Sequence, residues 1–289
     1  MLLFYAIGNT TYSECCYSRW ECRAQSSLLV LLMIVQCGMV AVTLLPLHGQ
    51  FDYQIGGPYK PKASVKIVAR DMSVAPVAGI YSICYINAFQ TQPGAKAWWT
   101  KNHPNLLLKS NNKLVEDPDW PGEYILDTRT AKNRAAIAKI VGAWIDECAK
   151  KGYKAIEPDN LDSYTRSKKL ITKQNNLDYA KLLAAHAHKK NLAFGQKNDA
   201  SITKAQAKNV GFDFGIVEEC QEFKECGKYD AVYGNHWIEI EYTDVKNATA
   251  LFKAACKARG NRISLIQRDR DVVKPSNKEE YVYKVCPSS

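Results

Sequence analysis

The segment Ala155-Ile156-Glu157-Pro158-Asp159-Asn160-Leu161-Asp162-Ser163-Tyr164 begins with apolar residues and continues into a cluster of acidic ones. Pro158 disfavours a helical conformation for Glu157 and has no N–H to donate to a sheet ladder. A strand that begins at the apolar residues is therefore expected to stop here. The carboxylates are predicted to lie at the C-terminal mouth of that strand and not inside a core.

A second acidic strand end follows about sixty positions later, in Phe214-Gly215-Ile216-Val217-Glu218-Glu219-Cys220. The C-terminal ends of barrel strands carry the active sites of barrel enzymes. A pair of carboxylates is the chemical equipment that cleaves a glycosidic bond. The two acidic ends therefore indicate an acid–base pair presented to a sugar.

Short apolar runs alternate with helical patterns from Phe51 onward, which is typical of βα units and a parallel sheet. Several runs are apolar at consecutive positions, as expected of strands covered on both faces. The predicted strands are Phe51–Ile55, Val65–Ala69, Ile80–Ile86, Lys154–Glu157, Leu192–Gln196, Phe214–Val217, Trp237–Ile240 and Ile263–Gln267.

Helical patterns cover Thr130–Lys151, Leu177–Lys190 and Asn247–Arg259, and glycines follow the first and the third of them. Eight strand–helix alternations in about 240 residues match the usual size of a barrel, about 250 residues. The sequence therefore predicts the α/β class and a (β/α)8 TIM barrel, formed as a single domain by residues 51–289.

The connection between the third strand and the first helix, residues 87–130, is too long for a plain loop. It contains Trp98, Trp99 and Trp120 together with several prolines. We expect it to fold over the mouth of the barrel as a partial lid, in which residues 124–126 add a short strand.

Residues 1–50 are predicted to be a partly disordered leader. Residues 28–47 are almost continuously apolar, and Arg19 and Arg23 precede them. The run exceeds the roughly 7–15 residues of a signal-peptide core and reaches the roughly 20 that span a bilayer. We favour a secretory signal peptide over a type II membrane anchor. The protein is then secreted and has no membrane association once the leader is removed.

The chain has ten cysteines, of which Cys15, Cys16, Cys22 and Cys37 belong to the leader. The six that remain, an even number behind a secretory leader, indicate disulfides, although six cysteines allow 15 connectivities. Cys220 with Cys226 is the simplest local pair. Cys256 with Cys286 and Cys84 with Cys148 are the further candidate pairs.

The net charge of +10 is of the kind that attracts nucleic acid or an anionic surface. Its lysines, however, are spread along the helical segments. Residues 213–244 run against the average, because nine acidic residues there face two lysines. We therefore assign the basic excess to the solvated outer surface and expect no nucleic-acid partner.

Other chemistries lack their sequence signatures. The chain has no glycine-rich phosphate loop, no Gly-x-Ser-x-Gly elbow and no dinucleotide fingerprint. Its cysteines lack zinc-finger spacing, and His186 and His188 are two residues apart on a helix, which does not place them on one face. We expect no metal and no cofactor.

Glu157-Pro158-Asp159-Asn160, followed by Asp162 and Tyr164, resembles the D/E-P-D-N-x-D-x-Y motif of glycoside hydrolase family 114. The resemblance covers roughly residues 51–244 and implies an endo-α-1,4-polygalactosaminidase barrel with an acidic groove. Further segments fall in the family's order: Ile83-Cys84-Tyr85-Ile86-Asn87, Trp120-Pro121-Gly122-Glu123, Leu126-Asp127, Ala187-His188, Gln196-Lys197-Asn198, Val217-Glu218-Glu219-Cys220, Cys226 and Ile240-Glu241-Tyr242.

The sequence departs from the family pattern in three places. Glu157 stands where the family often has Asp, and Glu219 stands where it usually has Gln. The opening Phe51-Asp52-Tyr53-Gln54 replaces one richer in tryptophan. These differences leave the reaction class unchanged but bear on the preferred substrate.

Asp159 is the predicted catalytic nucleophile or base, and Glu218 is the predicted proton donor or its partner. Glu219 replaces Glu218 if the strand register slips by one, because adjacent residues point to opposite faces. The competing interpretations are a structural turn at Asp159 and a charged rim residue at Glu218.

The predicted substrate-binding residues fall into three groups. Carboxylates act as ligands, electrostatic supports or salt-bridge partners, tyrosines stack on sugar rings, and Lys197 with Asn198 orients the catalytic pair. The carboxylates and tyrosines are Glu157, Asp162, Glu219, Glu241, Tyr85, Tyr164 and Tyr242.

Together these features predict a secreted, monomeric, endo-acting glycoside hydrolase. Its partner is a polysaccharide substrate, an α-1,4-linked galactosamine-containing polymer that two carboxylates cleave. Two alternatives remain open at this stage. One is a carbohydrate-binding barrel without turnover, and the other is a hydrolase of a different polysaccharide, because barrels host many functions.

Overall fold

The computed structural model describes residues 42–287 of the chain. They belong to one compact unit that spans Val40–Ser289. Most of the predicted leader, including its four cysteines, lies outside the described residues. Within them, no helix is both long and apolar enough to cross a membrane.

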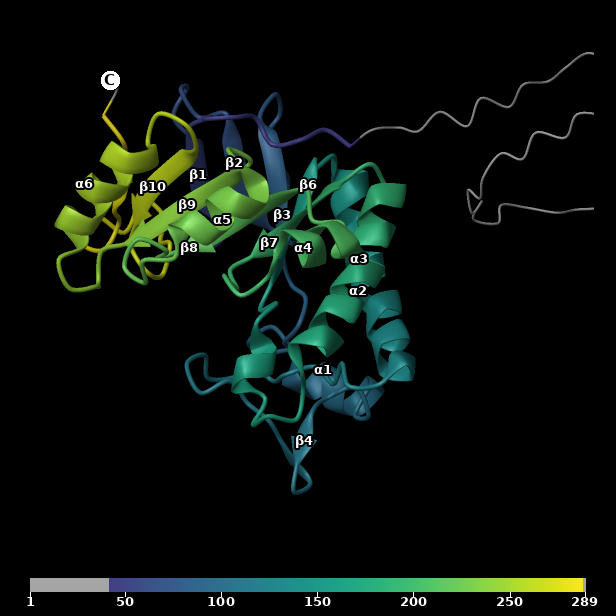
Figure 1. The fold of residues 1–289 in the computed structure, drawn as a ribbon. Helices are drawn as coiled ribbons and strands as arrows, with labels where there is room; N and C mark the ends of the chain where they lie inside the picture. The colour runs from purple at the N-terminus through teal and green to yellow at the C-terminus, as the bar shows by residue number, and fades with distance from the viewer. Residues whose placement is uncertain (1–41, 288–289) are drawn as a thin grey trace, which may run out of the picture. The chain divides into compact units, whose positions relative to one another are not determined.

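Eight parallel strands form the body of the fold (Figure 1). Each pairs with the next along the chain, and all eight predicted strands are confirmed with ends shifted by at most two residues. They are β1 (Phe51–Gln54), β2 (Ile67–Asp71), β3 (Tyr81–Asn87), β6 (Ala155–Asp159), β7 (Ala193–Lys197), β8 (Phe214–Glu218), β9 (Trp237–Tyr242) and β10 (Ser264–Arg268).

The sheet curls until β10 lies against β1, which gives the TIM barrel predicted from the sequence. Arg268 at the end of β10 donates a hydrogen bond to the carbonyl oxygen of Tyr53 in β1. A ninth strand, β11 (Tyr283–Val285), pairs antiparallel with β10. From it the Tyr283 hydroxyl donates to the Phe51 carbonyl at 2.8 Å. Side chains therefore bridge the seam between the first and last parallel strands.

The three predicted helices are confirmed, and α4 and α5 join them around the barrel. The helices outside the barrel are α2 (Ala131–Lys151), α3 (Lys173–Lys189), α4 (Lys204–Val210), α5 (Cys226–Tyr233) and α6 (Ala248–Arg259). Thr130 begins α2 by accepting a hydrogen bond from the Asn133 amide at 3.1 Å. Gly152 ends it in the left-handed conformation at φ 94°.

The expectation of a helix after every strand is wrong at three places. The connections 55–66 and 72–80 contain no helix, and β10 is followed by β11. The first two segments are short and interrupted by proline and glycine, which prevent a helix long enough to cover the sheet. The helical cover therefore lies over β3 to β10.

Pro158 does not end β6, which continues to Asp159. Pairing with β3 extends over the whole strand, up to Asn87 opposite Asp159. Pairing with β7 includes only Ala155 and Ile156. The effect of the proline is thus confined to one side of the strand, where β6 and β7 separate and leave room between their carboxyl ends.

Three apolar clusters hold the barrel, and the third packs β8, β9 and β10 against α5 and α6. The inner cluster consists mainly of alternate strand residues, such as Phe51, Ile67, Phe214 and Ile240. The outer cluster joins the opposite strand faces to α2, α3 and α4. Leu45 also packs in the inner cluster, so residues 42–50, which the sequence analysis placed in the leader, contact the barrel.

The long connection after β3 forms the lid, defined here as residues 88–129. It contains α1 (Lys96–Asn102) and the paired strands β4 (Lys109–Ser110) and β5 (Lys113–Leu114), and Figure 1 shows α1 and β4 beyond one end of the neighbouring helices α2 and α3. Residues 124–126 form isolated bridges and not the short strand expected. Trp99 is buried and meets Trp144 of α2 edge to face. The lid is therefore anchored to α2 through Trp99.

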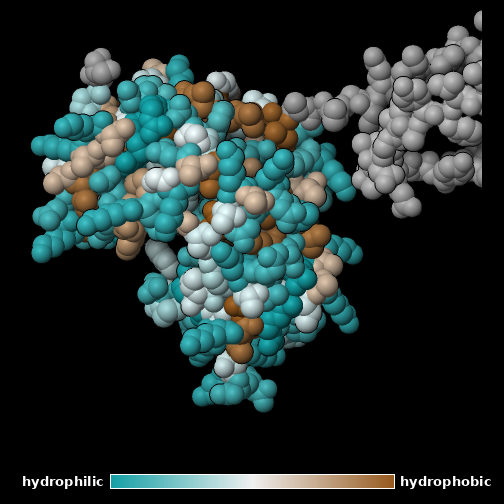
Figure 2. All heavy atoms as spheres, in the orientation of Figure 1, coloured by the Kyte–Doolittle hydropathy of each residue, from teal (hydrophilic) through white to brown (hydrophobic). Residues whose placement is uncertain are grey.

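The three disulfides pair as the sequence analysis proposed: Cys84–Cys148, Cys220–Cys226 and Cys256–Cys286. The first ties β3 to α2, and the third ties α6 to the segment after β11. The second closes the loop that directly follows β8. On the face shown in Figure 2, hydrophilic residues predominate and the hydrophobic ones are scattered among them.

Gly195 provides a test of the barrel packing. A Cβ at this position would lie 2.9 Å from the Phe214 ring and 3.2 Å from the Ile156 carbonyl oxygen. We expect Gly195→Ala to lower the free energy of unfolding by about 1–3 kcal/mol, as overpacking of a core does. Urea unfolding of the disulfide-intact protein measures the change.

Gly227 in α5 is the matched control, because a Cβ there has no neighbour within 4 Å. Gly227→Ala is expected to leave stability unchanged or to raise it by about 0.5–1 kcal/mol, the difference between the two residues in a helix. Equal stability of the two variants would contradict the packing described for Gly195.

Candidate active site

A cleft of about 560 Å³ lies at the carboxyl ends of the barrel strands. Strand ends line it with Tyr85, Asp159, Lys197, Glu218 and Tyr242, and the lid lines it with Trp120 and Glu123. A larger cavity of about 1100 Å³ lies by α6 and β11, where lysines line it and no carboxylate does. Only the first of these two cavities has the acidic groups that glycosidic chemistry requires.

Lys197 occupies the centre of this site. Its side chain is 3% exposed, and its ammonium lies 3.0 Å from Glu157, 3.3 Å from Asp159 and 3.4 Å from Glu218. Burial alone would lower the pKa of this ammonium, but the surrounding carboxylates outweigh burial and raise the pKa well above its usual value. Lys197 therefore stays charged and neutralises acids from two other strands.

Asp159 ends β6 with its carboxylate directed at the cleft. The Tyr85 hydroxyl donates to one oxygen at 2.6 Å, and the backbone amide of Asn160 donates to the other at 2.9 Å. Burial favours the neutral form, yet Lys197 and these two donors outweigh burial and lower the pKa of Asp159 below its usual value. Asp159 is thus held as the carboxylate anion, the form that a nucleophile or base needs.

Glu218 ends β8 on the other side of Lys197. Asn198 makes a reciprocal pair with it: its side-chain amide donates to the Glu218 carboxylate at 2.8 Å and accepts from the Glu218 backbone amide at 2.9 Å. The Tyr242 hydroxyl donates to the second carboxylate oxygen. The side chain is therefore fixed from three directions within the cleft.

Residues next to the catalytic candidates adopt left-handed backbone conformations. Asn160 has φ 66°, Asn198 has φ 49° and Glu219 has φ 59°. Asparagine tolerates this region better than other side chains, whereas glutamate does so at some cost. Glu219 is held there by a bidentate ion pair with Arg270, which also binds Asp244. The chain therefore turns sharply after β6, β7 and β8, which leaves Asp159, Lys197 and Glu218 at the strand ends.

Glu157 lies deeper in the barrel than Asp159 and does not line the cleft. Tyr53 donates to it at 2.8 Å, and Lys197 reaches the same oxygen. Burial raises the pKa of Glu157, while Lys197 opposes the increase. Its role is therefore electrostatic, because it binds the Lys197 ammonium from the barrel interior.

The structure brings most of the predicted substrate ligands to the cleft. Tyr85, Asp162, Lys197, Asn198, Glu219 and Tyr242 line it beside Asp159 and Glu218. Tyr164 does not, because its hydroxyl binds Asp199 at 3.1 Å outside the lining residues.

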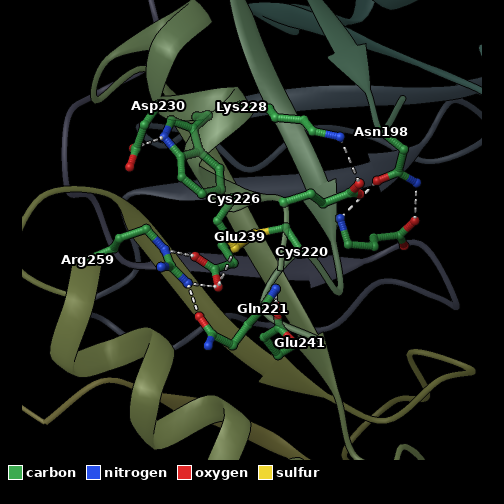
Figure 3. The surroundings of a disulfide bond; sticks show 12 residues. Asn198, Cys220, Gln221, Cys226, Lys228, Asp230, Glu239, Glu241 and Arg259 are labelled. Atoms are coloured by element: carbon green, nitrogen blue, oxygen red, sulfur yellow. Dashed lines mark hydrogen bonds and ion pairs between the residues drawn. A yellow bond between two sulfur atoms is a disulfide. The ribbon is translucent and has the colours of Figure 1, made fainter. Parts of the chain in front are cut away.

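Glu241 also lies away from the cleft, beside the Cys220–Cys226 disulfide (Figure 3). It accepts from the backbone amide of Gln221 at 3.0 Å, and burial raises its pKa to about 8. Figure 3 shows Arg259 reaching from α6 to Glu239 and Gln221, both at 2.7 Å. This network fastens the loop that follows Glu218, so Glu241 supports the site from outside the barrel wall.

Several residues that line the cleft were not assigned to the site from the sequence, and they include four on the lid and the loops. Arg166 joins the lid to the loop after β6 by binding Asp117 at 2.6 Å and Asn160 at 2.9 Å. The others are Trp120, Glu123 and Arg270. A signal existed for two of them, because Trp120-Pro121-Gly122-Glu123 lies within the family-like segments.

Comparison with known proteins agrees with this geometry. The model of glycoside-hydrolase family GH114 matches residues 39–289. Comparison with curated proteins yields no match. Aspergillus fumigatus Ega3, solved in complex with galactosamine, superposes with a TM-score of 0.66 at 21% identity, over 85% of this chain and 98% of that one.

The glycoside hydrolase domain of PelA from Pseudomonas aeruginosa superposes with a TM-score of 0.51 at 13% identity. The match covers 77% of this chain and 94% of that one. At these identities the two solved structures establish the shared fold.

Replacing Lys197 tests the electrostatic description. Lys197→Met leaves buried carboxylates without their shared cation, and we expect it to lower the free energy of unfolding by about 3–5 kcal/mol near neutral pH. In the wild type the lowered pKa of Asp159 gives stability that is lost as the pH falls. In Lys197→Met the Asp159 carboxyl group is buried without a cation and takes up a proton when the protein folds. Lowering the pH therefore stabilises the folded variant.

The stability gap between wild type and Lys197→Met should therefore narrow as the pH falls towards about 4, near the ordinary carboxyl pKa. Urea unfolding at neutral and acidic pH measures the gap. Lys190→Met is the control, because Lys190 is half-exposed and pairs with Asp146 outside the cleft. A gap that stays constant with pH would refute the proposed charge balance.

Proposed function

Because the chain belongs to glycoside-hydrolase family GH114, we propose that it is an endo-acting enzyme that hydrolyses α-1,4 linkages in a galactosamine-containing polysaccharide. One observation carries the proposal: Asp159 and Glu218 come from different strands and meet in one cleft around a single buried ammonium. The galactosamine bound to Ega3 supports the substrate class.

Asp159 is the nucleophile in this proposal, because Lys197 and Tyr85 hold it as an anion. Glu218 enters this step as the carboxylic acid: Asp159 attacks the anomeric carbon, the bond from that carbon to the glycosidic oxygen breaks, and Glu218 gives its proton to the departing oxygen. Water then attacks the glycosyl–enzyme ester, and Glu218 takes the proton that this water releases. Asp159 is released from the ester as a carboxylate and Glu218 is protonated again, so both groups return to their starting states.

The charge of the cleft suits a cationic polymer. Eight carboxylate residues line it against three cationic ones, in a chain whose total charge is +10. Salt screens exposed charges beyond about 8–10 Å, so a bound sugar experiences the local acidity more than the distant lysines. The net positive charge of the whole chain therefore does not prevent a cationic polymer from binding in the acidic cleft.

Aromatic side chains supply the apolar contacts that sugar rings use. The Trp120 side chain lies at the cleft with 50% of its surface exposed, although tryptophan is usually well covered. An exposed indole at the edge of a cleft offers a flat face on which a pyranose can stack. Tyr242 provides a second aromatic edge beside Glu218.

An extracellular location fits the chemistry of the cysteines. All six cysteines of the described residues form disulfides, and such bonds persist in oxidising compartments. We propose that the enzyme works outside the cell on a polymer too large to be imported.

Neutralising the catalytic pair should remove activity without unfolding the protein. Asp159→Asn and Glu218→Gln are each expected to slow release of oligosaccharides from an α-1,4-linked galactosamine polymer by at least about 100-fold. Mass spectrometry of the products measures the release. Glu147→Gln, an exposed substitution on α2, is the control. Near-wild-type release by Asp159→Asn would overturn the assignment.

The shared contact with Lys197 also bears on stereochemistry. The nearest oxygens of Asp159 and Glu218 lie within about 7 Å of each other, which includes the roughly 5–5.5 Å of retaining enzymes and only the lower edge of the inverting range. We expect the first-formed product to retain the α configuration. Proton NMR of the anomeric signals during early hydrolysis tests this, and a β product would exclude Asp159 as nucleophile.

A further inference from the structure

The turn between β9 and α6 contains a motif that the proposed reaction does not use. Asn247-Ala248-Thr249 has the form Asn-x-Ser/Thr with a residue other than proline in the middle, which is the acceptor sequence for N-linked glycans. A second copy, Asn9-Thr10-Thr11, belongs to the leader and lies outside the described residues. Residues 42–287 therefore offer a single acceptor sequence.

Asn247 is exposed, and its side chain is not used by the fold. It stands directly before the first helical residue of α6, with a left-handed backbone at φ 62°. An asparagine in that position normally accepts a hydrogen bond from an amide of the first helical turn. Asn247 makes no such bond. Within the described part of the chain its side-chain amide has no hydrogen bond, so this group is free to carry a substituent.

Thr249 supplies the hydroxyl that the acceptor sequence requires. It lies in the first turn of α6 and is exposed. Threonine is a weaker helix former than alanine, and among residues 42–287 the Thr249 hydroxyl has no hydrogen-bond partner that would offset this. The structure thus explains neither the amide nor the hydroxyl of the motif, and both groups remain available in the folded protein.

The surroundings of the motif have room for a bulky sugar. Thr249 is one of the residues that line the cavity of about 1100 Å³ beside α6. No residue of the motif lines the acidic cleft. Polar groups that are buried without partners lose their hydration at a large cost. A glycan on this exposed turn stays in water, and its attachment point lies outside the acidic cleft.

The cysteines indicate the compartment in which such a modification occurs. The described residues hold three disulfides, and these bonds form and persist in oxidising compartments such as the secretory pathway. N-linked glycans are characteristic of surface loops of proteins that take this route. The disulfides and the acceptor sequence therefore point to the same compartment.

We propose that Asn247 carries an N-linked glycan. In the transfer, the side-chain amide nitrogen of Asn247 forms a bond to C1 of the first sugar of a lipid-linked oligosaccharide diphosphate. The bond from C1 to the diphosphate oxygen breaks, the lipid diphosphate leaves with the electron pair, and the amide nitrogen loses one proton. The inference goes beyond the hydrolase reaction and uses only the proposed passage through an oxidising compartment.

The test is the mass of the peptide that contains Asn247. The full chain is expressed in a eukaryotic cell that N-glycosylates its secreted proteins, and the peptide is analysed by mass spectrometry before and after treatment with peptide N-glycosidase. We expect the mass of an oligosaccharide on Asn247, which the treatment removes while it converts Asn247 to aspartate. An unmodified Asn247 would overturn the proposal.

Two variants remove the acceptor sequence while keeping the turn. Thr249→Val removes the hydroxyl and leaves Asn247 in place, and Asn247→Asp keeps a short polar side chain that tolerates the left-handed conformation. We expect both variants to lose the glycan. A glycan that stays on Asn247 in Thr249→Val would overturn the assignment to this motif.

Asn191 is the matched internal control. It is exposed and left-handed at φ 59°, but Ala193 stands two positions later, where the motif needs a hydroxyl. We expect Asn191 to stay unmodified in the same digest. Sugar on both asparagines would contradict the proposal, because exposure alone would then direct the modification. The measurement needs no substrate, so its outcome is independent of the hydrolase assignment.

Discussion

The site depends on one buried ammonium shared by three carboxylates. Glu157 and Asp159 lie on β6, Lys197 lies on β7 and Glu218 lies on β8, so adjacent strands supply all four charges. Buried carboxylates repel one another and lose their hydration, and only a cation between them makes the arrangement stable. Because the side chains of a strand alternate between its faces, these charges meet only in the observed register.

The same charge balance explains why two acids of one strand have different roles. Glu157 and Asp159 are two residues apart and face the same interior, but only Asp159 reaches the cleft. The deeper Glu157 positions Lys197, and Lys197 in turn keeps Asp159 ionised. Divergence of β6 from β7 after Ile156 opens the space in which this occurs. The divergence of β6 from β7 thus provides both the cleft and the space in which Lys197 contacts the carboxylates.

Sequence patterns predicted the strands and the two acidic strand ends because these features are local or repeat with the period of a strand. Of the disulfides only Cys220–Cys226 is local, whereas Cys84–Cys148 joins residues 64 positions apart. Strand alternation could also have separated Glu241 from Tyr242, because adjacent strand residues face opposite sides of the sheet. Glu239 contacts Arg259 on the outer face, and Glu241 lies on that same face. The contributions of Arg166 and Arg270 were not predictable, and Glu123 was indicated only by the family-like segment that contains it. They come from the lid and from loops whose positions depend on long-range contacts such as Arg166 with Asp117.

An acidic cleft in a basic protein is stable because most of its half-buried acids contact a cation: Asp159 and Glu218 share Lys197, Asp162 pairs with Arg166 and Glu219 pairs with Arg270. These contacts hold the proposed catalytic carboxylates in place, while the cleft as a whole keeps an excess of acidic residues. Trp120, carried by the lid, adds an exposed aromatic surface at the edge of this cleft. Arg166 ties the lid to the loop after Asp159 by binding Asp117 and Asn160, so the aromatic surface of the lid and the proposed nucleophile share one rigid support.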